Sequence, residues 1–184
     1  SGQPAVTDPR EIRKDTRTFV LSMTVTENQI WQWLEEVTDP EIPVLTVVDL
    51  GVVRHVDMEH DHPIIKITPT YSGCPAMNEI EANIKAKLKD EGVNNVEVQT
   101  VLSPPWTTDW MTEKGREKLR EYGIAPPEGS SADKSVLFGK AREVQCPHCG
   151  SKHTTMVSQF GSTACKALYK CNECLEPFDY FKCI

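Results

Sequence analysis

Residues 39–56, DPEIPVLTVVDLGVVRHV, contain the pattern from which the fold can be predicted. The stretch is rich in β-branched residues and is interrupted at Asp49-Leu50-Gly51, so it predicts strands at about 44–48 and 52–58. The following segment EHDHP, at 59–63, predicts a turn, and residues 64–68 predict the returning strand of a hairpin. The centre of the chain therefore predicts a small β-sheet.

Helices are predicted on both sides of this hairpin. Before it, Thr26 and Gln29 have the spacing of a capping box, and apolar residues recur at helical spacing up to residue 37. After it, residues 77–88 show the same spacing, and Gly92 stands where a C-terminal cap belongs. Residues 93–102 alternate as another strand. The order α-β-β-β-α-β predicts an α+β fold, with a small mixed sheet and helices on one side.

Composition divides the chain into four segments. Residues 1–18 are polar and aperiodic and predict a flexible N-terminal arm. Residues 19–122 predict the α+β domain, which ends in an amphipathic helix at about 112–122. Gly, Pro and Ser mark residues 123–140 as a linker, and residues 141–184 predict a second, smaller module.

The overall composition argues against two classes of partner. The chain has 184 residues, with 20 Lys and Arg against 27 Asp and Glu, and a formal net charge of −7. Binding to nucleic acid needs clustered positive charge, so we expect no nucleic-acid partner. The most apolar run, at 44–53, is far shorter than the ~20 residues of a membrane span. With no signal peptide apparent, we expect a cytoplasmic protein without a membrane partner.

The C-terminal module contains six of the seven cysteines. Two CxxC motifs supply four of them: Cys146, Cys149, Cys171 and Cys174. Two such motifs predict a closed tetrahedral site of four thiolates, which in a small module holds a structural zinc ion. Iron is the alternative ion, because tetrahedral sulfur accepts both metals. We expect Cys165 and Cys183 to be small buried residues, with a substitute ligand as the alternative.

The seventh cysteine lies in the segment TPTYSGCP, at 68–75. We expect Cys74 at or just before the start of a helix, with Pro75 at the first helical position. Unpaired backbone N–H groups and the helix dipole would then lower the pKa of its thiol. Thr68 and Thr70 share one face of the preceding strand and would supply hydroxyls. The alternative is a capping cysteine without chemistry.

Three acidic residues, Asp39, Glu41 and Asp49, lie close together in the stretch that begins at residue 39. Each of them also fits a purely structural role, as a residue that caps a helix or forms a turn. The sequence contains no Gly-rich phosphate loop, no Ser/His/Asp order and no HExxH motif. We therefore do not expect an enzyme.

Residues 39–53 followed by 68–75 resemble the metal–sulfur cluster assembly domain of iron–sulfur carrier and targeting proteins. In that family the cysteine before the helix is the functional residue, so the resemblance implies transient binding of iron or an iron–sulfur cluster at Cys74. It also implies that the same site includes Asp39, Glu41, Asp49, Thr68 and Thr70.

The segments 106–127 and 146–184 resemble the PaaD family of bacterial phenylacetyl-CoA epoxidase systems. This resemblance implies an accessory factor in aerobic phenylacetate degradation, which assists delivery of iron or a cluster to the reductase or the diiron oxygenase. The implied partners are those two proteins and the iron–sulfur assembly machinery. The resemblance to cluster-assembly domains also allows a homodimer, which no residue of this sequence establishes. There are two alternatives. In the first, the protein is a structural subunit that docks within the oxygenase complex. In the second, it transfers electrons through an iron-loaded ribbon.

Overall fold

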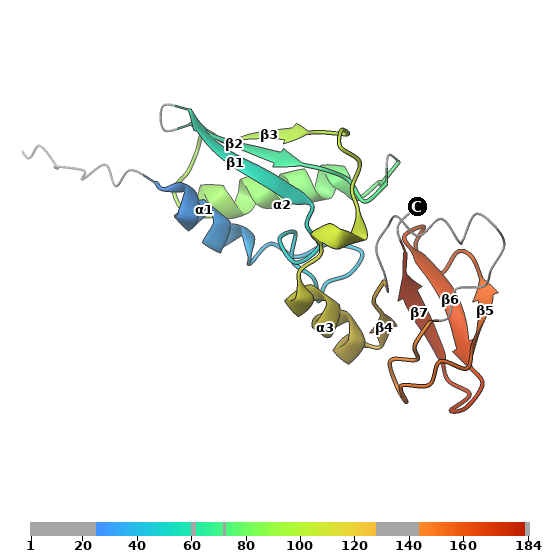
Figure 1. Ribbon diagram of the computed structural model, residues 1–184. Helices are drawn as coiled ribbons and strands as arrows, with labels where there is room; N and C mark the ends of the chain where they lie inside the picture. Colours follow the sequence, from blue (N-terminus) through green and yellow to red (C-terminus); the bar gives the residue numbers. More distant parts are fainter. Residues whose placement is uncertain (1–24, 60–61, 72, 128–143, 183–184) are drawn as a thin grey trace, which may run out of the picture.

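The protein is described by a computed structural model that covers residues 25–59, 62–71, 73–127 and 144–182. Its strands form two sheets, one of three strands and one of four (Figure 1). The predicted arm at 1–18, residues 128–140 of the predicted linker, and Cys183 lie outside the described residues. The predicted fold class, a mixed α+β domain followed by a β-ribbon, is confirmed.

The three-stranded sheet has the order β1-β2-β3. Strand β1 (Val53–Glu59) pairs antiparallel with β2 (His62–Ile67), which pairs parallel with β3 (Glu97–Thr100). A parallel pair needs a crossover connection, and helix α2 (Met77–Asp90) provides it. The hairpin, the second helix and the last strand of the prediction are confirmed.

Helices α1 and α2 cover the same face of this sheet (Figure 1). Helix α1 (Glu27–Leu34) begins at the predicted capping box, in which Thr26 and Gln29 each accept a backbone N–H of the other. The helix residues that face the sheet are at most 1% exposed: Ile30, Leu34, Ile80, Ile84 and Leu88. Burial of each such side chain contributes about 1.5–3 kcal/mol, so this contact is the main core of the domain.

Residues 44–48 do not form the predicted strand. Among the described residues, the strand-type pairing of this segment is limited to one isolated antiparallel β-bridge, between Thr38 and Thr46. Side-chain oxygens of Asp39, Thr46 and Asp49 accept nearby backbone N–H groups, and such local bonds compete with strand pairing. The apolar side chains of this segment still enter the core, which explains its β-branched composition.

Helix α3 (Glu113–Tyr122) follows the short 3₁₀ helix η1 (Thr108–Trp110) and confirms the predicted helix at 112–122. It packs on the turn that ends at Gly51. This glycine has a φ of +70°, and a Cβ atom there would lie 2.3 Å from the carbonyl oxygen of Trp110. The position therefore needs glycine both for its backbone conformation and for the close approach.

The four-stranded sheet is the ribbon, with the order β4-β7-β6-β5. Its three consecutive antiparallel strands are β5 (Thr154–Ser158), β6 (Lys166–Cys171) and β7 (Pro177–Phe181), and β6 pairs with both of the others. Strand β4 (Ile124–Ala125) lies parallel to β7. The first residues of the segment that we assigned to a linker thus form an edge of the ribbon.

The ribbon and the first domain share a hydrophobic core. Cys165 and Phe181 of the ribbon belong to the same buried cluster as the core of the first domain. The rings of Phe181 and Trp106 meet edge to face, with centroids 6.0 Å apart, and the Trp106 indole donates to the Leu50 carbonyl over 3.0 Å. The ribbon is therefore packed on the first domain (Figure 1).

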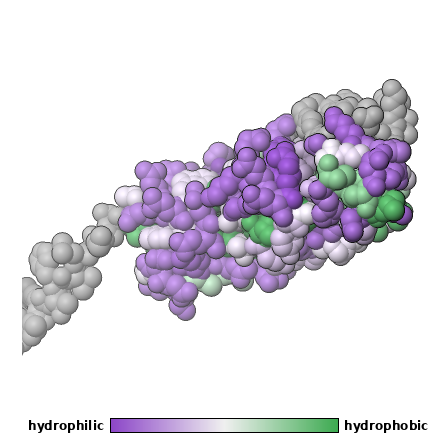
Figure 2. All heavy atoms as spheres, turned by 90° about the horizontal axis from the view of Figure 1, so that it is seen from below, coloured by the Kyte–Doolittle hydropathy of each residue, from purple (hydrophilic) through white to green (hydrophobic). Residues whose placement is uncertain are grey.

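Apolar side chains gather at the ribbon end of the face seen in Figure 2. The large exposed apolar residues of the ribbon are Met156, Val157, Phe160 and Leu175. We call the three that lie on β5 and in the loop directly after it, Met156, Val157 and Phe160, the ribbon patch. Two of them lie on β5, an edge strand of the sheet. In the described part of the chain, no helix is both long and apolar enough to cross a membrane.

Candidate functional site

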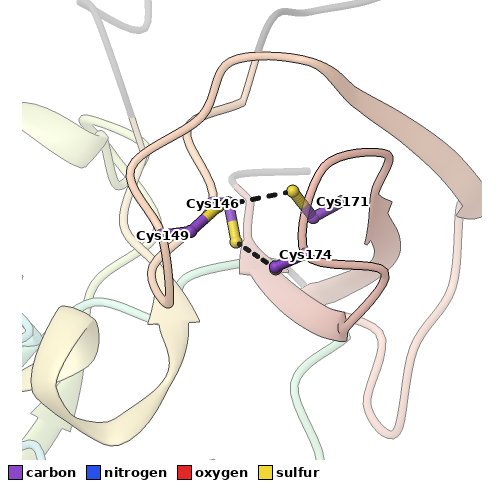
Figure 3. A group of neighbouring side chains, drawn as sticks. All are labelled: Cys146, Cys149, Cys171 and Cys174. Atoms are coloured by element: carbon purple, nitrogen blue, oxygen red, sulfur yellow. Dashed lines mark hydrogen bonds between the residues drawn. The ribbon is translucent and has the colours of Figure 1, made fainter.

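The four cysteines of the two CxxC motifs meet at one end of the ribbon (Figure 3). Their sulfur atoms all lie within 4.8 Å of one another. The Cys146 and Cys174 sulfurs are 3.8 Å apart, and those of Cys149 and Cys171 are 3.5 Å apart. Four thiolates at ~2.3 Å from one ion stand about 3.8 Å apart in a tetrahedron. The arrangement therefore fits a single tetrahedral metal ion.

The backbone around this centre favours thiolates. The N–H groups of Cys174 and Glu173 point at the Cys171 sulfur and lower the pKa of its thiol to about 6. Gly150 and Leu175, which directly follow the second cysteine of each motif, both have positive φ angles. His153 contacts Glu173 and is not part of the four-sulfur group. The donor set suits zinc and iron alike.

Cys74 lies in the loop between β2 and α2, just before the helix as predicted, but the prediction that Pro75 occupies the first helical position is wrong. Helix α2 begins at Met77, so Cys74 precedes it by a turn and Pro75 lies outside the helix. The Cys74 N–H donates to the Tyr71 carbonyl over 3.1 Å. Thr68 and Thr70, at the start of the same loop, are buried.

The predicted lowering of the Cys74 pKa is wrong. Burial raises the pKa of this thiol, and the negative charges of Glu41 and Asp39 raise it further. Backbone N–H groups of Ala76 and Met77 act in the opposite direction, as we expected, but they are outweighed. The resting side chain is therefore a neutral thiol beside two carboxylates.

The turn at Asp39–Ile42 positions the carboxylates of Asp39 and Glu41. The Asp39 carboxylate accepts the backbone N–H groups of Glu41 and Ile42 over 2.9 and 2.8 Å, which is typical of an Asx turn. Burial raises the pKa of Asp39 although both bonds oppose the shift. Glu41 takes no part in holding this turn with its side chain, and its carboxylate extends toward the ribbon.

The ribbon contributes a second thiol to this region, which the sequence did not indicate. The Cys165 thiol donates to the Glu41 carboxylate, with sulfur and oxygen 3.3 Å apart, and accepts from the Thr163 hydroxyl over 3.0 Å. Cys165 is only 4% exposed, as predicted for a buried cysteine, and burial raises its pKa to about 12. No sequence signal links Cys165 to Glu41, because they are 124 positions apart.

Asp49 faces a different neighbour. Its carboxylate accepts from the Thr112 hydroxyl over 3.1 Å and from the Lys118 ammonium, both on the α3 side. Burial opposes ionisation, yet Lys118 and Thr46 hold the pKa of Asp49 below its usual value. The structure therefore brings together Asp39, Glu41 and Cys74, and it directs the Asp49 carboxylate toward α3.

Two protein families match the two parts of the chain. Residues 27–100 match the family described as "Iron-sulfur cluster assembly protein", and residues 130–182 match "PaaD zinc beta ribbon domain". The first match covers the Cys74 loop, and the second covers the four-sulfur centre.

Some related proteins match both of these parts of the chain, and others match only one. A protein of Escherichia coli (strain K12), described as a candidate D subunit of 1,2-phenylacetyl-CoA epoxidase, is 53% identical over 85% of this chain and 93% of its own. The Fe-S protein maturation auxiliary factor YitW of Bacillus subtilis (strain 168) is 43% identical, over 47% of this chain and 85% of its own. A crystal structure of a domain of unknown function from Bacillus anthracis covers 50% of this chain and 90% of its own, with 33% identity and a TM-score of 0.48.

Proposed function

Because the chain belongs to the PaaD family of phenylacetyl-CoA epoxidase components, we propose that it is an accessory maturation factor of the epoxidase system in aerobic phenylacetate degradation. Its cargo is iron or an iron–sulfur cluster, and its client is the reductase or the diiron oxygenase. The cargo is supported by relatives named as Fe-S protein maturation auxiliary factors. In this proposal the chain supplies metal and does not catalyse epoxidation.

One observation carries the proposal: the Cys74 thiol lies in the electrostatic field of two carboxylates, those of Glu41 and Asp39. Negative charges that disfavour a thiolate favour a cation at the same place, because the cation both replaces the thiol proton and compensates the carboxylates. Sulfur and carboxylate ligands together suit iron. We propose that Thr68 and Thr70 line this site and that Asp49 supports it indirectly, by fixing the 46–51 turn against α3.

A carrier must also release its cargo. A loop with one thiol and carboxylates binds a metal ion more weakly than four thiolates, so the Cys74 site is suited to transfer and the ribbon centre to retention. We assign a structural zinc ion to Cys146, Cys149, Cys171 and Cys174, with iron as the alternative. All six described cysteines are free thiols, which fits the reducing cytoplasm as the proposed compartment.

We propose that the ribbon patch recognises the client. Its apolar side chains include neighbours on β5 and in the loop that follows it, and an edge strand also offers unpaired backbone groups to a partner. Iron–sulfur assembly proteins are the proposed donors of the cargo.

A structural subunit is the second candidate function. The neutral state of the Cys74 thiol, whose pKa is raised by burial, is also the state of a buried capping cysteine without chemistry. In that case the protein would stay bound to the oxygenase, and Cys74 would be dispensable.

The deciding experiment is analysis of zinc, iron and sulfide in wild type and Cys74→Ala, both purified without oxygen, together with the iron content of reductase and oxygenase produced alongside each. We expect one zinc per chain in both proteins, loss of iron from the variant, and an iron-deficient client. Asn78→Ala, an exposed change beside the loop, is the control and should behave as wild type. A fully loaded client in the presence of Cys74→Ala would contradict the carrier function.

A further inference from the structure

We propose that β5 is a docking strand. An extended segment of the client adds to this edge of the ribbon sheet, and the segment has apolar residues in its middle and acidic residues at both ends. The inference rests on the proposed accessory function and deepens it, because it states how the client is bound and by what chemistry. It involves no metal ion and no residue of the Cys74 loop.

The two edges of the ribbon sheet differ in what covers them. At one edge, β4 lies directly after α3, and both of its residues, Ile124 and Ala125, are at most 5% exposed. At the other edge, β5 has β6 on one side and, among the described residues, no strand on the other. None of the residues of β5 is buried. An edge strand leaves part of its backbone N–H and C=O groups unpaired, so β5 can bond to a partner strand.

The composition of this edge is not that of a strand protected against pairing. Exposed edge strands commonly carry charged residues or proline, yet residues 154–160, TTMVSQF, contain neither. A shift of register at Val157 limits regular pairing with β6 to Thr154–Met156. The side chains of the ribbon patch are between 49% and 59% exposed. This edge therefore fits strand addition, with backbone bonds along residues 154–156 and the ribbon patch against apolar side chains of the client.

A lysine lies near each end of this edge. Lys170 on β6 is the cross-strand partner of Thr155, and its side chain is exposed. Beyond the other end of β5, the Lys182 ammonium lies 4.3 Å from the centroid of the Phe160 ring and donates to the Gln159 carbonyl. The described lysines that pair with a described carboxylate are all in the first domain: Lys66, Lys85, Lys87 and Lys118. Both charges beside β5 are thus available to acidic residues of a partner.

Charge complementarity favours an acidic client segment over a second copy of this chain. Residues 144–182 contain four lysines against three acidic residues, whereas residues 25–127 contain nine Lys and Arg against 18 Asp and Glu. The ribbon therefore attracts an acidic segment that the first domain repels. Two β5 strands in antiparallel contact would place Lys170 of each chain at the same end as Lys182 of the other. Like charges across a strand pair oppose such self-pairing.

The test uses the full-length, zinc-loaded protein, with the purified reductase and the purified oxygenase as probes in separate titrations. Lys170→Glu is the key variant, because it reverses an exposed charge beside β5 without changing the strand itself. Lys89→Glu is the control, since it makes the same change at an exposed lysine of α2 on the first domain. Lys170→Arg keeps the charge and should bind as wild type does. Zinc content and melting temperature should be unchanged in all three variants.

We expect Lys170→Glu to weaken binding of the client by about threefold to tenfold at low salt, and by less at high salt, because exposed charges are screened. Lys89→Glu should have no effect. Hydrogen exchange should slow at the backbone amides of residues 154–156 when the client binds, as strand addition requires. A client that leaves these amides unchanged, or that binds Lys170→Glu and Lys89→Glu with equal affinity, would overturn the inference and leave the carrier function standing.

Two further outcomes separate the inference from the proposed function. A dimer of the protein alone in light scattering, with protected amides at residues 154–156, would show that a second copy occupies the edge, and the inference would be wrong. If neither the reductase nor the oxygenase binds, the inference fails together with the assignment of those clients. The carrier function is measured separately, by the iron content of a client produced with Cys74→Ala.

Discussion

Phe181, near the end of β7, meets Trp106 edge to face, and both side chains are almost completely buried. The two residues belong to different modules, so their contact helps to hold the ribbon on the first domain. An edge-to-face pair contributes about 0.5–1.5 kcal/mol beyond the burial of its apolar surface.

We expect Phe181→Ala to lower the free energy of unfolding by about 3–5 kcal/mol, because it leaves a cavity between the modules. Urea unfolding followed by Trp fluorescence measures this loss. Phe160→Ala is the control, since Phe160 is exposed and its loss should change stability by less than about 0.5 kcal/mol. Equal effects of the two substitutions would mean that the modules do not share a core.

Removal of the ribbon metal should unfold the ribbon and destabilise the first domain as well. A structural zinc ion contributes about 10–16 kcal/mol in small zinc modules, and here the ribbon shares buried residues with its neighbour. Treatment with a strong chelator, followed by circular dichroism and elemental analysis, should give a metal-free protein with a much lower melting temperature. Cys171→Ser should reproduce this result and Cys165→Ser should not. An unchanged melting temperature after metal loss would rule out a structural metal.

Asp49 should make stability depend on pH. Its pKa is held below the ordinary 3.8, so its contribution is present above pH 3.8 and is lost as the pH falls through the lowered folded-state pKa. We expect Asp49→Asn to cost about 1–3 kcal/mol at pH 7, because it removes a charged bond with Lys118, and less below pH 3.8. Urea unfolding at a series of pH values tests both statements.

Asp57→Asn is the matched control for Asp49→Asn. Asp57 also has a lowered pKa and a lysine partner, Lys66, at 2.8 Å, but the pair is exposed. Exposed ion pairs contribute little to stability, so this substitution should have almost no effect at either pH. A similar loss at both aspartates would refute the role that we give to the buried contact with α3.

Gly51→Ala should destabilise the protein far more than Gly92→Ala. Both glycines have positive φ, so both substitutions carry backbone strain of about 1 kcal/mol. Only at Gly51 would the new Cβ meet a neighbouring backbone, that of Trp110, whereas Gly92 has nothing within 4 Å. Thermal unfolding of the two variants measures the difference, and equal melting temperatures would contradict the close packing of η1 on the 46–51 turn.

Met156→Lys should weaken binding to the client without weakening the fold. Met156 lies on the exposed edge strand β5, so a charge there disrupts the ribbon patch while the core stays unchanged. Co-purification with the reductase and the oxygenase measures the effect, and unfolding experiments measure stability. Leu102→Lys, a change at a somewhat more exposed apolar residue of the first domain, is the control. Retained co-purification by Met156→Lys would show that the client binds elsewhere.

Local features of this protein could be predicted from the sequence alone. The capping box at Thr26, the helical spacing in α2 and the two CxxC motifs each involve residues within a few positions of one another, so their geometry follows from the backbone. The same holds for α3, whose cap at Thr112 and ending at Gly123 fit the predicted bounds. Recognition of the Cys74 loop as a candidate site belongs to this class.

Tertiary structure decided the features that depend on distant residues. Residues 44–48 have strand-like composition, but side-chain bonds within the turns and the packing of α3 hold them in another conformation. The pKa of Cys74 rises because burial and two carboxylates outweigh the backbone N–H groups, and both effects depend on neighbours that only the fold brings to the thiol. The contact between Glu41 and Cys165 exists only because the ribbon packs on the first domain. That packing is stabilised by the burial of apolar residues such as Phe181 and Trp106. The hydrophobic effect is not directional, so no spacing pattern in the sequence predicts which apolar residues will meet.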